Sequence, residues 1–200
     1  RYFLQKYILK KNYKSKIVCI ADVDNVLKNK KNLTFNFFNK LIESLKKNRH
    51  ILNGISVKTS PFYYDMLAFQ SKKIKLPNIL EIQKSKNIFK GYYLRKKFIF
   101  SNQKKINKIK KNFTLSSFNG MCLYNYEDYI KGDYFYKEKK SNKIVKFNEH
   151  LKFNLSLHDK NEKYILIDDN FYLSTPDEHY PYDNFIDFYL SKLKNFFNFI

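Results

Sequence analysis

Apolar residues recur at helical spacing in four parts of the chain, which we predict to be helices. The first covers residues 2–11, the second contains residues 35–45, the third contains residues 147–158, and the last lies near the C-terminus. The last three are expected to turn these side chains inward: Phe35, Phe38, Leu41, Ile42 and Leu45; Phe147, Leu151, Leu155 and His158; Phe185, Ile186, Tyr189, Leu190, Leu193, Phe196 and Phe197.

Short apolar runs between these helices predict strands. They cover residues 17–20, 51–57 and 164–167, and residues 113–124 have the pattern of strand, turn and strand. The acidic pair that follows residue 167 is interpreted as a turn at the end of its strand. Because strands alternate with helices, the predicted fold class is α/β.

Other stretches predict less regular structure. Pro61 is expected to break the chain before a short helix, and residues 127–143 are predicted to be a polar loop. Residues 71–112 are rich in Lys and have no clear period apart from one candidate helix over 79–88. This region is consistent with a surface insertion or with a segment that covers a substrate.

The composition fits one globular domain with a strong positive charge. The 200 residues include 39 Lys+Arg and 18 Asp+Glu, which gives a formal net charge of +21. Such an excess is found in proteins that bind nucleic acid or anionic surfaces. Abundant Lys, Asn, Ile, Phe and Tyr are also typical of an AT-rich genome, and only Arg1, Arg49 and Arg95 offer the bidentate contacts that phosphates favour. We favour the compositional explanation and expect no nucleic-acid partner.

Cysteine content and hydropathy bear on the compartment. Cys19 and Cys122 lie in apolar runs, which predicts buried free thiols and a reducing environment. No run approaches the roughly 18 apolar residues that cross a bilayer. We therefore expect a cytoplasmic domain with at most peripheral membrane contact. The start at Arg1, inside a predicted helix, indicates a single domain from a longer protein.

Two carboxylates follow the first predicted strand. Asp22 and Asp24 come directly after the apolar run and are followed by Asn25. In α/β sheets, ligands bind beyond the C-terminal ends of strands. Carboxylates placed there can hold a divalent cation that binds phosphate oxygens, or can attack a phosphate directly. A solvated turn would have the same residues, so the interpretation depends on segments further along the chain.

Three later segments combine aromatic, acidic and small residues. Together with the acidic pair they are, in chain order, Asp22-Val23-Asp24; Tyr63-Tyr64-Asp65-Met66-Leu67-Ala68-Phe69-Gln70; Ser116-Ser117-Phe118-Asn119-Gly120-Met121-Cys122-Leu123-Tyr124; and Asn148-Glu149-His150. As a set they resemble a family of glycosyltransferases with the GT-A fold, found in microbes and large viruses. The resemblance runs from about residue 1 to about residue 180. The chain departs from the family pattern in having Phe69-Gln70 for Leu-Arg, Asn119 for Gly and Asn148 for Cys.

The resemblance implies a GT-A-like, Rossmann-like mixed sheet flanked by helices, without the family's first strands, which hold much of the nucleotide base. It also implies a metal-dependent transfer of a sugar from a nucleotide-sugar donor to a hydroxyl group of a glycan or other acceptor. Mn²⁺ or Mg²⁺ on Asp22 and Asp24 would neutralise the leaving diphosphate, with His150 or His158 completing the metal shell. Glu149 would be the general base.

The remaining matched residues would contact the donor and the acceptor: Tyr63, Tyr64, Asp65, Phe118, Asn119 and Gly120. Gly120 would let the backbone approach the sugar closely. Plainer interpretations stay open for several residues. Tyr63 and Tyr64 are equally typical of core and rim positions, Glu149 of an exposed helix residue, and His158 of a core histidine on an apolar stripe.

Two other functions are compatible with parts of the sequence. The apolar strand with Asp22 and Asp24 also resembles the first motif of the haloacid dehalogenase phosphatases, in which Asp22 would be the nucleophile. Residues 55–60 and the pair Asp168-Asp169 would then supply that family's later motifs. A non-catalytic basic module that binds nucleic acid or an anionic surface is the other alternative.

Overall fold

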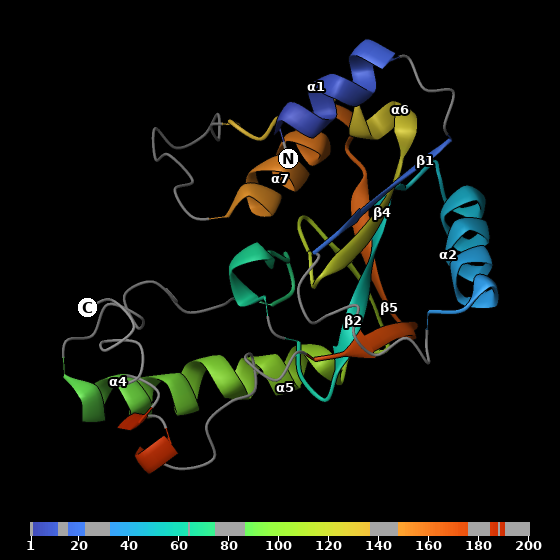
Figure 1. Ribbon diagram of the computed structural model, residues 1–200. Helices are drawn as coiled ribbons and strands as arrows, with labels where there is room; N and C mark the ends of the chain where they lie inside the picture. The colour runs from blue at the N-terminus through green and yellow to red at the C-terminus, as the bar shows by residue number, and fades with distance from the viewer. Residues whose placement is uncertain are drawn as a thin grey trace.

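The computed structural model places the strands in one sheet (Figure 1). It describes residues 2–11, 16–22, 33–63, 65–74, 87–136, 148–175, 185–187, 189 and 190. Its strands are β1 Ile17–Ala21, β2 Leu52–Ser60, β3 Lys111–Thr114, β4 Met121–Asn125 and β5 Tyr164–Ser174. Its helices are α1 Tyr2–Lys11, α2 Phe35–Lys47, the 3₁₀ helix η3 Met66–Ala68, α4 Ile88–Leu94, the π-helix η4 Arg95–Phe100, α5 Ser101–Asn107, α6 Tyr126–Tyr129 and α7 Glu149–Asn161.

The described strands form a mixed sheet in the order β1-β4-β2-β5-β3. The central strands β2 and β5 run parallel, whereas β1, β3 and β4 run antiparallel to their neighbours. Helices cover both faces of the sheet (Figure 1). The predicted α/β class with a mixed sheet flanked by helices is therefore confirmed.

The segment 113–124 does form two strands, but they do not make a hairpin. β3 pairs with β5 at one edge, while β4 lies between β1 and β2 near the other edge. Residues 115–120 therefore cross from one side of the sheet to the other. The apolar pattern predicted both strands correctly. It gave no indication that the segment between them crosses the sheet.

β1 is an edge strand of the described sheet, antiparallel to β4. Val18 and Ile20 are buried on one face, whereas Cys19 is exposed. The prediction that Cys19 is buried is wrong because side chains alternate along a strand, and it lies on the face where Ile17 and Ala21 are only half-buried. Cys122, on the interior strand β4, is buried as predicted.

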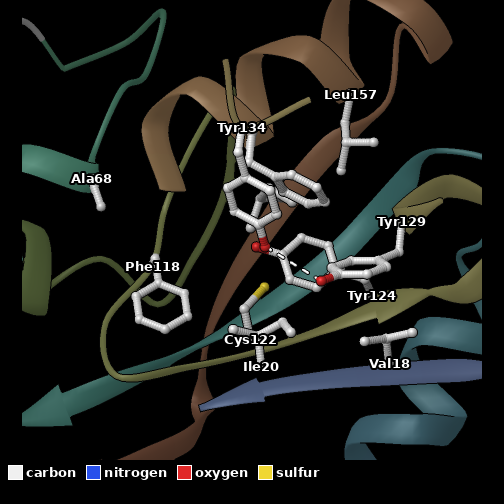
Figure 2. Packing of buried hydrophobic residues seen from close by; sticks show 11 residues of the cluster. Val18, Ile20, Ala68, Phe118, Cys122, Tyr124, Tyr129, Tyr134 and Leu157 are labelled. Atoms are coloured by element: carbon white, nitrogen blue, oxygen red, sulfur yellow. Dashed lines mark hydrogen bonds between the residues drawn. The ribbon is translucent and has the colours of Figure 1, made fainter. Parts of the chain in front are cut away.

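One face of the sheet packs against α1, α6 and α7 (Figures 1 and 2). The buried residues of this cluster are Val18, Ile20, Ala68, Phe118, Cys122, Tyr124, Tyr129, Tyr134, Phe153, Leu157 and Ile165. The hydroxyl groups of Tyr129 and Tyr134 meet at 3.4 Å within it (Figure 2). These aromatic side chains fix the position of α7, the helix that carries one of the predicted motifs.

The opposite face packs against α2. Leu41 and Leu45 have no exposed surface, as predicted, but Phe35 is 83% exposed. The helix begins directly after its N-cap Thr34, and Phe37 rather than Phe35 packs against the cluster, with its ring 6.1 Å from that of Phe171. The prediction that the Phe35 side chain faces the core is therefore wrong.

The buried face of α7 is rotated from the predicted stripe. Leu155 is buried as predicted, but Leu151 and His158 are only half-buried, and the completely buried apolar residues are Phe153 and Leu157. Phe147 lies outside the described residues. The apolar pattern was misleading because this helix also buries His150, Asn154 and Ser156, which a hydropathy pattern assigns to solvent.

β5 continues well beyond the predicted end at residue 167. A register irregularity opposite residues 56–58 of β2 accommodates Asp168 and Asp169 within the strand. The amide N–H of Asn170 donates to Asp168 Oδ1 at 2.9 Å, so the local turn forms without ending the strand. The prediction that these residues end the strand is wrong.

The Lys-rich region contains the consecutive helices α4, η4 and α5, which project past the sheet at the α4 end (Figure 1). Ile99 and Ile106 anchor them in a cluster with Tyr63, Met66 and Ile167. Residues 75–86, including most of the predicted helix over 79–88, lie outside the described residues.

Helical backbone is present at residues 185–187, 189 and 190. Ile186, Tyr189 and Leu190 are exposed at 67%, 40% and 49%, so the inward prediction for these side chains is wrong. The rest of that predicted helix lies outside the described residues. Within the described ranges, no helix has the length and apolar character that crossing a bilayer requires.

Candidate functional site

The C-terminal end of β1 is fixed against the crossing segment 115–120. The backbone N–H of Asp22 donates to the carbonyl oxygen of Gly120 at 2.8 Å, which extends the β1–β4 pairing by one residue. Gly120 has a φ of 86°, a conformation that residues with a Cβ rarely adopt. The glycine in this motif is thus required by the backbone that positions Asp22.

Asp65 lies at the start of η3 and makes two hydrogen bonds that fix its position. Its Oδ1 accepts the backbone N–H of Ala68 at 3.1 Å, and its own N–H donates to Asn119 Oδ1 at 3.2 Å. The amide nitrogen of Asn119 donates to Thr59 Oγ1 at 2.6 Å. One buried Asn side chain therefore joins the crossing segment, the end of β2 and the Asp65 turn.

The first turn of α7 approaches the same carboxylate. Asn148 caps the helix, with Oδ1 accepting the N–H groups of His150 at 2.8 Å and Leu151 at 3.3 Å. Its amide nitrogen donates to Asp65 Oδ2 at 3.5 Å. The crossing segment and the first turn of α7, which are far apart in sequence, thus both contact Asp65.

The carboxyl group of Asp65 has a strongly perturbed pKa. Burial, and then the negative charge of Asp22, raise it from 3.8 to about 7, although hydrogen bonds from the Ala68 and Leu67 N–H groups and from Asn148 oppose the shift. Asp65 therefore gains or loses its proton near neutral pH. A pKa near the working pH is typical of groups that take part in acid–base chemistry or that hold cations.

Buried ring-bearing side chains pack next to these groups. The rings of His150 and Phe118 stack with centroids 3.4 Å apart, and Tyr63 donates from its hydroxyl group to the Phe118 carbonyl oxygen at 3.2 Å. Tyr63 and Phe118 have no exposed surface, and His150 is 4% exposed. The three side chains therefore pack in the interior next to the site. Because Tyr63 and Phe118 are completely buried, their rings cannot contact a sugar in this conformation.

The predicted metal site is only partly covered by the described residues. No group of three His, Cys, Asp or Glu side chains among them is arranged to hold a metal ion. Asp24 and Tyr64 lie outside the described residues. Asp22 and Asp65 are two carboxylates close enough for one charge to shift the pKa of the other. Two carboxylates fit Mg²⁺ or Mn²⁺, because such ions complete their coordination with water and substrate phosphates.

Glu149 is exposed in the first turn of α7, next to the capping residue Asn148 that contacts Asp65. Glu149 is thus one residue along the chain from a group that contacts Asp65, and its side chain is open to solvent. In the sequence, Thr59 was assigned only to the 55–60 motif of the phosphatase alternative, and nothing there indicated its contact with Asn119. Asn148 was noted only as a departure from a family pattern, although an Asn before Glu and a helix is also an N-cap signature.

Asp168 and Asp169 act on a buried lysine. Lys58 is 4% exposed and donates to the carbonyl oxygens of Asn107 and Ile109 at 2.7 and 2.8 Å. Burial lowers its pKa, and the charges of Asp169 and Asp168 oppose that change. The charge of Asp22 acts on the pKa of Asp65, whereas those of Asp168 and Asp169 act on the pKa of Lys58.

No protein-family model, no curated protein and no solved structure matches this chain.

Proposed function

We propose that this chain is a metal-dependent, GT-A-like glycosyltransferase domain that moves a sugar from a nucleotide-sugar donor to a hydroxyl group of a glycan or other acceptor. The observation that carries the proposal is the convergence of three sequence motifs on Asp65. Asn119 and Asn148 bond to it, and Asp22 raises its pKa. These are the segments whose order along the chain resembles that glycosyltransferase family.

The chemistry of sugar transfer matches these groups. The acceptor oxygen forms a bond to the anomeric carbon, the bond from that carbon to the donor diphosphate breaks, and the acceptor proton must leave. Glu149, exposed beside the cluster, is the candidate base for that proton. Asp22 and Asp65 would hold a divalent cation, with Asp24 as the further candidate ligand, and the bound cation would neutralise the diphosphate.

The neighbouring side chains keep these groups in place. Asn119 and Asn148 fix the orientation of the Asp65 turn, and the Phe118–His150 stack fills the space behind it. We therefore assign Phe118, Tyr63 and His150 to positioning. Such support holds reacting groups within the narrow range of geometry that transfer requires.

The phosphatase alternative has less support. It would use Asp22 together with Asp168 and Asp169, and the charges of the latter pair act on the pKa of buried Lys58. The glycosyltransferase hypothesis instead accounts for Asp65, Asn119 and Asn148 in one cluster.

Calorimetric titration tests the proposal. Nucleoside diphosphates with different bases are titrated, with and without Mn²⁺, into the wild type, Asp22→Asn, Asp24→Ala and the control Asp169→Asn, which changes the exposed carboxylate of the Asp168–Asp169 pair. We expect Mn²⁺-dependent binding in the wild type and the control, and its loss in the other two. Absence of binding in the wild type, or equal binding by Asp22→Asn, would contradict the proposal. So would hydrolysis of a phosphomonoester that Asp22→Asn abolishes.

Once a donor is known, Glu149→Gln tests the base. Its turnover should fall by roughly 100-fold or more with nucleotide binding unchanged. An unchanged turnover number would exclude Glu149 from that role.

A further inference from the structure

The helices α4, η4 and α5 lie within a stretch that carries only positive charge. Residues 87–112 contain no Asp or Glu and these nine basic residues: Lys90, Arg95, Lys96, Lys97, Lys104, Lys105, Lys108, Lys110 and Lys111. Lys90, Lys96 and Lys97 are exposed at the α4 end, where the helices project past the sheet (Figure 1).

Large apolar side chains are exposed at the same end. Phe89 is 72% and Tyr93 is 58% exposed, although the Phe89 ring stacks on Phe185 with centroids 4.4 Å apart. That stacking places the described residues of the C-terminal helix beside α4. We call the following exposed side chains the α4 surface: Lys90, Lys96, Lys97, Phe89, Tyr93, Ile186, Tyr189 and Leu190.

We propose that the α4 surface docks on an anionic lipid bilayer. Lysines attract the negative surface of such a membrane, while exposed aromatic and aliphatic side chains gain free energy by entering the interfacial region. Lys97 lies over the Tyr93 ring at 5.6 Å from its centroid. This contact joins a positive charge and an amphipathic ring, the combination found at membrane interfaces.

The side-chain types distinguish a bilayer from nucleic acid. Ile186 and Leu190 have no aromatic face on which a base could stack, yet both are exposed on the helix that contacts α4 through Phe185. Arg95 is the single arginine among the nine basic residues of this stretch and is half-buried, whereas nucleic-acid contacts favour exposed arginine. Asp187 is the charged residue among residues 185–187, 189 and 190, so this helix contributes apolar and not basic side chains to the α4 surface. The inference does not depend on the proposed enzymatic activity.

Co-sedimentation of the whole chain with phosphatidylcholine vesicles, with and without phosphatidylserine, tests this inference. We expect binding that requires phosphatidylserine. It should fall by roughly tenfold or more in Lys96→Glu/Lys97→Glu. The control Lys40→Glu/Lys47→Glu makes the same change of charge at exposed positions of α2, on the other face of the sheet, and should retain binding.

The apolar contribution is tested separately. Phe89→Ser and Ile186→Ser should each lower vesicle affinity several-fold, while Phe35→Ser, which removes an 83% exposed Phe from α2, should not. Circular dichroism checks that each variant is folded. Equal loss in both charge variants, no effect of either apolar variant, or tighter binding to an oligonucleotide than to the vesicles would overturn the proposal.

Discussion

Replacing Asp65 with Asn should stabilise the protein at pH 8 and slightly destabilise it at pH 4. The pKa of Asp65 is raised from 3.8 to about 7 in the folded protein. Between these values the folded state keeps a proton that the unfolded chain has released. Stability from this group is therefore fully present below about pH 4 and is lost as pH rises toward 7.

The size of the effect follows from the same shift and from the hydrogen bonds of Asp65. A difference between 3.8 and about 7 corresponds to about 4 kcal/mol of unfolding free energy lost by pH 8, at about 1.4 kcal/mol per pH unit. Asn can still accept the Ala68 N–H, but its amide N–H₂ meets the donating amide of Asn148. That lost hydrogen bond costs about 1 kcal/mol. We expect Asp65→Asn to be about 3 kcal/mol more stable at pH 8 and about 1 kcal/mol less stable at pH 4.

Urea unfolding followed by circular dichroism at several pH values between 4 and 8 measures this difference. Glu43→Gln, at an exposed position of α2, is the matched control and should show no comparable dependence on pH. A constant difference between wild type and Asp65→Asn across this range would refute the reasoning. A variant less stable than the wild type at pH 8 would also refute it.

Three further substitutions test the support of the site by urea unfolding. Gly54→Ala should destabilise the sheet by about 3 kcal/mol, because a Cβ there would lie 2.5 Å from the backbone oxygen of Leu123; equal stability would contradict the close approach. Tyr124→Phe should cost about 1–2 kcal/mol by leaving buried Asn154 Oδ1 without its 2.9 Å donor. Asn148→Ala should cost about 1 kcal/mol through loss of the α7 cap, and an unchanged free energy of unfolding would exclude that role.

The positions of helices and strands could be predicted from the sequence more easily than the side chains that each of them buries. Strong periods located α2, α7 and the apolar parts of β1, β2 and β5, because burial of a stripe or a run leaves a direct trace in sequence. Face predictions failed where burial did not follow hydropathy. Phe35 is exposed at a helix start and Cys19 at a sheet edge, while α7 buries Asn154, which bonds to Ser116 and to the Ser117 carbonyl oxygen.

The candidate site depends on a feature that local sequence does not encode, the path of residues 115–120. Since β3 and β4 lie near opposite edges of the sheet, this segment must pass across the ends of β5 and β2. The crossing brings Asn119 between Thr59 and Asp65, and it brings the Gly120 carbonyl oxygen to the Asp22 N–H. The motifs therefore identified residues that meet, but the reason they meet is the order of the strands. A hairpin between β3 and β4 would have separated Asn119 from both Thr59 and Asp65.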